Sequence, residues 1–73
     1  MERVFWIKFY EDGVFCSAIG QPKDTYGDAV YALASLAAQI AKQGFAIDYS
    51  QVGGFTYDRY GTLCTLKIEE DNQ

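Results

Sequence analysis

The stretch RVFWIKFYEDGVF, from Arg3 to Phe15, decides how this chain folds. At its centre, Asp12-Gly13 is a preferred pair for a two-residue type I′ turn, because both central residues of that turn need a positive φ. Apolar runs flank the pair, so the sequence predicts a β-hairpin over residues 3–20. Successive side chains of a strand point to opposite faces of a sheet, and here both sets are apolar. We therefore expect both faces of the hairpin to need a cover.

The register of the hairpin follows from its two-residue turn. The expected cross-strand pairs are Glu11 with Val14, Tyr10 with Phe15, Phe9 with Cys16, Lys8 with Ser17, Ile7 with Ala18 and Trp6 with Ile19. One face then carries Phe5, Ile7, Phe9, Cys16 and Ala18, and the other carries Val4, Trp6, Tyr10, Phe15 and Ile19 around Lys8. Because the first face has no charged side chain, we expect it to face the core.

An amphipathic helix is expected over residues 25–43. Asp24 or Thr25 is placed to cap its N-terminus, and Gly44 is placed to end it at the C′ position. At about 100° per residue, one side of the helix is apolar. This side carries Tyr26, Ala29, Val30, Leu33, Leu36, Ala37, Ile40 and Ala41. Tyr31 falls toward the polar side, which makes it a candidate exposed aromatic residue.

A second β region is expected over residues 45–69, and residues 70–73 are expected to be a solvated acidic tail. The second β region consists of a short strand from Phe55, a turn over 58–61 and a last strand over 62–69. It has one further short strand where Phe45, Ile47 and Tyr49 alternate with other residues. The 73 residues therefore predict a single α+β domain in ββαββ order. Its four- to five-stranded antiparallel sheet would carry one amphipathic helix packed on one face.

The charge balance disfavours nucleic acid as a partner. Ten acidic residues stand against six scattered basic ones, giving a net charge of −4. Binding to phosphate backbones needs clustered positive charge, which this sequence lacks. No apolar run is long enough to span a membrane, and no basic stretch followed by an apolar one opens the chain. We therefore expect no membrane partner, no signal peptide and a cytoplasmic location.

The residue types needed for catalysis and metal binding are scarce. The chain has no histidine, the commonest general base and metal ligand, and no glycine-rich phosphate loop. Cys16 and Cys64 lie in apolar strand patterns, so we expect two reduced and buried thiols, with a disulfide between the strands as the alternative. Apolar neighbours would also raise the pKa of either thiol. We expect no metal, no cofactor and no enzymatic activity.

A single helix covers one face of a sheet, so the second apolar face of the hairpin needs another cover. That cover is the Gly53–Gly61 segment folded back, a second copy of the chain, or a different protein. In the last two cases the face is a binding site, because clustered Trp, Tyr and Phe side chains concentrate interface energy. The predicted binding residues are Val4, Trp6, Lys8, Tyr10, Phe15, Ile19 and, on the helix, Tyr31.

These observations favour a non-catalytic protein–protein interaction module. The alternatives are binding of single-stranded nucleic acid through the aromatic face, and a homodimeric accessory protein. No small-molecule substrate is evident, since a domain of this size rarely has room for a pocket. In size, acidity and lack of catalytic residues the chain resembles small phage-encoded or mobile-element proteins that inhibit host machinery, anti-CRISPR inhibitors among them. That resemblance implies steric blockade of a host nuclease complex.

Overall fold

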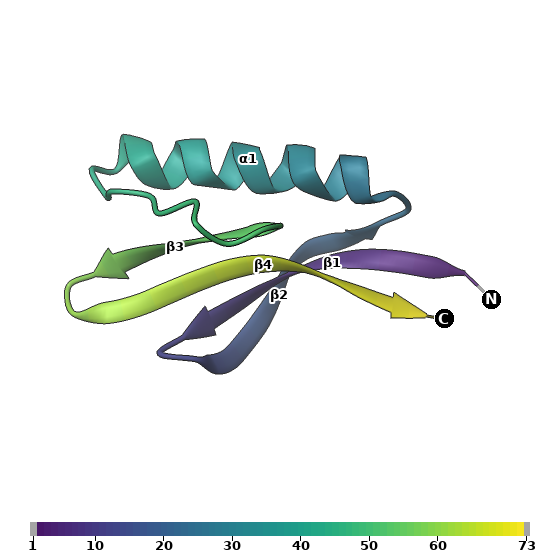
Figure 1. Ribbon diagram of the computed structural model, residues 1–73, viewed down its shortest axis with the longest axis horizontal. Helices are drawn as coiled ribbons and strands as arrows, with labels where there is room; N and C mark the ends of the chain where they lie inside the picture. Colours follow the sequence, from purple (N-terminus) through teal and green to yellow (C-terminus); the bar gives the residue numbers. More distant parts are fainter. Residues whose placement is uncertain (1, 73) are drawn as a thin grey trace.

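In the described part of the chain, four strands form one antiparallel sheet and one helix lies on one side of it (Figure 1). The computed structural model describes residues 2–72. The elements are β1 (Arg3–Glu11), β2 (Val14–Lys23), α1 (Tyr26–Lys42), β3 (Gly54–Arg59) and β4 (Thr62–Asn72). The strand order across the sheet is β2-β1-β4-β3. The predicted α+β class and the ββαββ order are confirmed, and the sheet has four strands.

The turn between β1 and β2 has the predicted geometry. Asp12 and Gly13 both have positive φ, 49° and 81°, as a type I′ turn requires. The backbone N–H of Asp12 also donates to the carbonyl of Leu63 at 2.8 Å, which extends the pairing of β1 with β4 into the turn. The tip of the hairpin is therefore fastened to the neighbouring strand.

Beyond the pairs next to the turn, the observed register of the hairpin differs from the predicted register by one residue. A β-bulge follows the first two pairs, so Phe9 pairs with Ser17, and Cys16 is the extra residue. Residues beyond a bulge exchange faces, because side chains alternate along a strand. Ile19 therefore pairs with Ile7 and packs against the core. The prediction that Ile19 lies on the uncovered face was wrong for this reason. Cys16 is exposed, which also corrects its predicted place in the core.

The helix begins and ends where its capping residues predict. The Thr25 hydroxyl accepts a hydrogen bond from the backbone N–H of Asp28 at 3.1 Å, which satisfies one unpaired donor of the first turn. Gly44 has φ 99°, and its N–H donates to the carbonyl of Ala41. The buried residues of the helix are Ala29, Leu33 and Ala37. The two alanines allow the helix to approach the sheet closely.

The core lies between α1 and the sheet. Its buried cluster consists of Ile7, Leu33, Ala37, Phe55, Tyr57, Cys64 and Leu66. Phe55 is the largest side chain that is almost completely removed from solvent, and it packs beside Tyr57 with ring centroids 6.3 Å apart. Both cysteines are free, and Cys64 is buried as expected. The face of β1 that was predicted to face the core, with Phe5 and Ile7, therefore does face the helix.

The C-terminal strand is longer than predicted and occupies a central place in the sheet. β4 pairs with the whole of β1, from Arg3 to Glu11, and Glu70 and Asp71 lie opposite Phe5 and Val4. The expected acidic tail over 70–73 was therefore wrong for residues 70–72, and residue 73 lies outside the described chain. Cross-strand charges stabilise the extension, because the guanidinium of Arg3 lies 3.5 Å from the Glu70 carboxylate.

The segment between α1 and β3 is a connection that lies on the helix side of the sheet (Figure 1). It is joined to the sheet by the isolated bridge between Asp48 and Thr56, and by a hydrogen bond from the N–H of Ile68 to the carbonyl of Gly53. Phe45 and Ile47 pack against the core, so their alternation reflects contact with the helix layer and the predicted fifth strand does not form. β3 is an edge strand paired with β4. The Gly53–Gly61 segment therefore does not fold over the opposite face of the sheet.

Candidate functional site

The sheet face opposite α1 has no cover within the described chain, and we call it the open face. Its members follow from the register of the paired strands. They are Trp6, Lys8 and Tyr10 of β1, Phe15 and Ala18 of β2, Thr56 and Asp58 of β3, and Leu63, Thr65, Lys67, Glu69 and Asp71 of β4. Val4 has the same orientation by register, but it is only 7% exposed and offers little surface. The open face runs the length of β1.

The two central strands bring polar and aromatic side chains together on the open face. Trp6 lies opposite Glu69, Lys8 opposite Lys67, and Tyr10 opposite Thr65. The sequence shows that Thr65 and Lys67 point away from the core, but not which strand lies beside them. Because β4 is the neighbour of β1, the face is mixed rather than uniformly apolar.

A network of charges occupies the middle of the open face. The Lys8 ammonium lies 3.4 Å from the Glu69 carboxylate and 3.6 Å from that of Asp71. The Tyr10 hydroxyl donates to the same Glu69 carboxylate. The Lys67 ammonium lies 3.8 Å from Glu69 and 4.7 Å from the centroid of the Tyr10 ring. Each carboxylate and ammonium group named here therefore has a partner of opposite charge.

The hydrogen bond between Tyr10 and Glu69 fixes their protonation states. It is the main reason that the pKa of Glu69 lies below its ordinary value, followed among the favourable causes by the charge of Lys8. The same hydrogen bond raises the pKa of Tyr10. At neutral pH the pair is therefore a carboxylate accepting from a neutral phenol, which holds the Tyr10 ring in one orientation.

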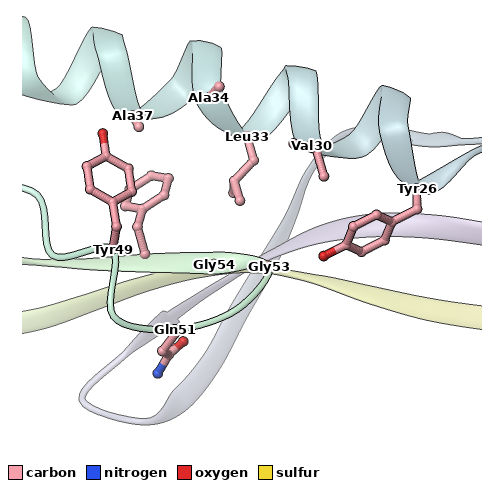
Figure 2. Close-up of a pocket in the computed structure, with 10 residues that line it drawn as sticks. Tyr26, Val30, Leu33, Ala34, Ala37, Tyr49, Gln51, Gly53 and Gly54 are labelled. Atoms are coloured by element: carbon pink, nitrogen blue, oxygen red, sulfur yellow. The ribbon is translucent and has the colours of Figure 1, made fainter.

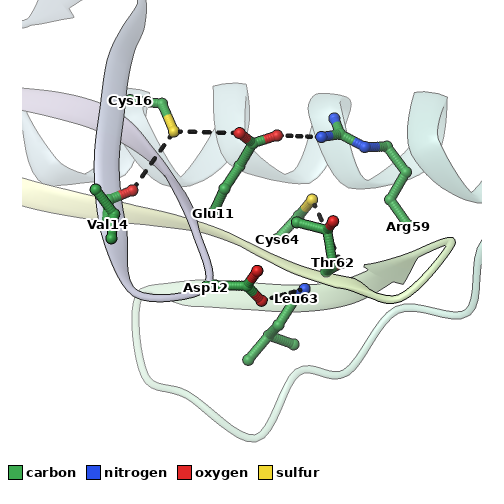
Figure 3. Close-up of polar contacts among 8 residues, drawn as sticks. All are labelled: Glu11, Asp12, Val14, Cys16, Arg59, Thr62, Leu63 and Cys64. Atoms are coloured by element: carbon green, nitrogen blue, oxygen red, sulfur yellow. Dashed lines mark hydrogen bonds and ion pairs between the residues drawn. The ribbon is translucent and has the colours of Figure 1, made fainter.

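The end of the open face at the hairpin tip is apolar. The Tyr10 and Phe15 rings meet edge to face, with centroids 5.7 Å apart. Phe15 of β2 is 52% exposed, and Leu63 of β4, at the same end of the open face, is 48% exposed. The Asp12 carboxylate accepts from the backbone N–H of Leu63 at 2.9 Å (Figure 3). This contact joins the tip to β4, so the exposed apolar side chains stand on a braced support.

The only exposed thiol lies on the other side of the hairpin tip. The Cys16 thiol donates to the Glu11 carboxylate at 3.6 Å, and Arg59 donates to the other oxygen of that carboxylate (Figure 3). Partial desolvation and then the Glu11 hydrogen bond raise the pKa of Cys16. The guanidinium of Arg59 is engaged by Glu11 and also lies 6.0 Å from the centroid of the Phe9 ring. This environment favours the neutral thiol and not a nucleophilic thiolate.

The structure brings together only some of the predicted binding residues. Trp6, Lys8, Tyr10 and Phe15 share the open face, Val4 is buried within it, and Ile19 faces the core. Tyr31 is 81% exposed as expected, but it belongs to α1, on the other side of the sheet. The polar members from β4 were missed because strand order is not a local property of the sequence. The alternation of apolar and polar residues over 62–69 predicts which β4 side chains point away from the core, but not that they lie beside β1.

Within residues 2–72, no cluster of three or more His, Cys, Asp or Glu side chains is arranged to hold a metal ion. The one helix of this described part of the chain falls short of the length and apolar character needed to cross a membrane. Comparison with models of known protein families, with curated proteins and with solved structures found no match for this chain. The site is therefore interpreted from its own geometry.

Proposed function

We propose that the protein works without catalysis, as a protein-binding module that docks its open face on another protein. The observation that carries the proposal is the exposed apolar end of this face, where Phe15 packs against the Tyr10 ring and Leu63 is exposed on β4. Exposed aromatic and aliphatic side chains on a rigid support lose little conformational entropy when a partner covers them. The braced hairpin tip supplies that support.

The two parts of the open face have different roles in this proposal. The apolar end supplies binding free energy, because well-packed aromatic side chains dominate interfaces. The charged middle supplies orientation, and its internal ion pairs limit the number of unpaired charges left when water is displaced. The net charge of −4 favours a partner with a basic surface, which it attracts at long range. If that surface is a nucleic-acid channel, docking blocks the channel sterically.

The proposal is tested by affinity capture from the cells that make or host the protein. The wild type is compared with Trp6→Ala and Phe15→Ser, which alter opposite ends of the open face. Tyr31→Ser is the control, because it removes an exposed aromatic residue from α1, on the other side of the sheet. We expect both open-face variants, with circular dichroism unchanged, to lose the same partner that Tyr31→Ser retains. Retention of every partner by both open-face variants would count against the proposal.

The same proteins separate two other functions. Stacking of single-stranded nucleic acid on Trp6 and Tyr10 would weaken steeply with added salt, whereas an apolar protein interface would not. The pairing of Lys8 and Lys67 with Glu69 and Asp71 leaves this face without excess positive charge, which favours the protein partner. Self-association is measured by light scattering. A dimer that Phe15→Ser converts to a monomer would assign the open face to a second copy of the chain.

A further inference from the structure

A cavity of about 320 Å³ lies on the helix side of the molecule, away from the open face (Figure 2). α1 forms its roof, and the end of the connection with the start of β3 forms its wall and floor. Its volume falls at the lower end of the range of about 300–1,000 Å³ that is typical of ligand pockets. The protein therefore has room for a small molecule, contrary to the expectation from its size.

The lining of the cavity is apolar and rich in rings. Val30 and Leu33 descend from the helix, and Tyr49 rises from the connection (Figure 2). Phe55 of β3 also lines the cavity. Tyr26 closes the end nearest the helix N-terminus, and its hydroxyl points toward the glycines of the floor. No charged side chain lines the cavity among the described residues. Such a site gives water few hydrogen-bond partners and excludes ionic ligands.

The sequence keeps this space open with residues that have little or no side chain. A Cβ at Gly53 would lie 2.7 Å from the hydroxyl oxygen of Tyr26, a side chain that also lines the cavity. A larger residue at Gly53 would therefore need a shift of the Tyr26 side chain. On the roof, Ala34 and Ala37 face the space where longer side chains would fill it. The cavity is therefore bounded in part by positions that carry little or no side chain.

The wall at Tyr49 is joined to the sheet by backbone hydrogen bonds on either side of this residue, and the Tyr49 ring lies 6.3 Å from the Phe55 ring between their centroids. Asp48 and Thr56 exchange backbone hydrogen bonds of 2.8 and 3.0 Å, and the carbonyl of Gly53 accepts from the N–H of Ile68 at 2.8 Å. Between these anchors Tyr49 is 65% exposed. A ligand that packed on its ring would bury apolar surface that now faces solvent, which stabilises the bound state. The Tyr49 ring is thus available as a flap over an occupied cavity.

We propose that this cavity binds a small, neutral aromatic molecule of one or two rings. Its ring would pack among the side chains of Tyr49, Phe55 and Leu33, and a single hydroxyl group would lie toward the Tyr26 hydroxyl. This inference does not depend on the proposed function, because the cavity and the open face lie on opposite sides of the sheet.

The test uses 1-naphthol as the probe and the 1-naphthoate anion as its charged counterpart. Both are titrated into the full chain, and binding is followed by the shifts of the backbone amide signals in NMR. Ala34→Phe places a ring in the cavity from an exposed helix position. Ala38→Phe adds the same ring one turn later, at an exposed position that does not line the cavity, and is the matched control. Ala34→Leu fills less space and serves if the larger variant disturbs the fold.

We expect 1-naphthol to shift amides within residues 26–37 and 49–55, and 1-naphthoate to bind at least about tenfold more weakly. Ala34→Phe or Ala34→Leu should weaken naphthol binding by about tenfold or more, while Ala38→Phe changes it by less than about twofold. Equal binding of the two probes, unchanged binding by the Ala34 variants, or shifts centred on Trp6 and the open face would each overturn the proposal. So would an absence of shifts up to the solubility limit of 1-naphthol.

Discussion

Adding one methyl group at two glycines should move the stability of this protein in opposite directions. Gly54 is buried where β3 meets β4, and a Cβ there would lie 2.8 Å from the Leu66 carbonyl oxygen and 2.9 Å from the Lys67 Cβ. Gly27 lies in the first turn of α1, where the nearest atom to an added Cβ is the Thr25 hydroxyl oxygen at 3.9 Å. Gly54→Ala should therefore destabilise the fold, and Gly27→Ala should stabilise it.

The magnitudes follow from what each methyl group meets. At Gly54 the close atoms are backbone and Cβ atoms of a central strand, so the two strands must separate, and overpacking of this kind costs about 2 kcal/mol. At Gly27 no atom has to move, and the better helix propensity of alanine contributes about 0.5 kcal/mol in a first turn. A domain of this size has a free energy of unfolding on the order of 5 kcal/mol, so the loss at Gly54 is a large part of it.

Urea unfolding followed by far-ultraviolet circular dichroism measures both changes. With a slope of about 1 kcal/mol per molar urea, the midpoint should fall by about 2 M in Gly54→Ala and rise by about 0.5 M in Gly27→Ala. A midpoint for Gly54→Ala equal to or above that of the wild type would show that β3 and β4 do not approach as closely as described. A lowered midpoint for Gly27→Ala would refute the account of the first turn of α1.

Two further predictions concern titratable groups. The pKa of Glu69 lies below its ordinary value of 4.5, mainly because Tyr10 donates a hydrogen bond to it. The Glu69 carboxylate therefore stabilises the fold fully above pH 4.5, and this contribution is lost as the pH falls through the lowered pKa of the folded protein. Urea midpoints over an acidic pH series should therefore fall less steeply for Glu69→Gln than for the wild type, and equal slopes would contradict the network. Native protein should react with iodoacetamide at Cys16 alone, and at Cys64 only after unfolding, as counted by mass spectrometry. Because the pKa of Cys16 is raised, its rate should still increase above pH 9.0, and a plateau below that value would argue against the contact with Glu11.

Local signals in the sequence predict the elements of this fold well. The Asp12-Gly13 turn, the Thr25 cap and the Gly44 end each depend on residues close in the chain, and each is confirmed. The helix bounds of 25–43 differ from Tyr26–Lys42 by one residue at each end. These features were predictable because backbone conformation at caps and turns depends on the local residues.

The arrangement of the strands was less predictable, because it depends on residues far apart in the chain. Placing β4 beside β1 brings Glu69 to Tyr10 and Lys8 across more than half of the sequence. The acidic run over residues 69–71 is interpreted as a tail unless the strand that pairs with it is known. Phe45 and Ile47 alternate like a strand, yet they pack under the helix. Periodicity shows that a side chain is buried, but it does not show which layer buries it.

The bulge at Cys16 explains why half of the hairpin prediction held. Before the bulge, Phe15 stays opposite Tyr10 and leaves its ring on the open face. After it, the alternation is reversed, so Ile19 joins the core and Ala18 takes the place opposite Lys8. One inserted residue thus removes a large apolar side chain from the open face near its charged middle, while the apolar end at the hairpin tip is retained. On β2, the aromatic surface of the open face is therefore confined to Phe15, before the bulge, where a docking partner would have to reach it together with Tyr10 of β1.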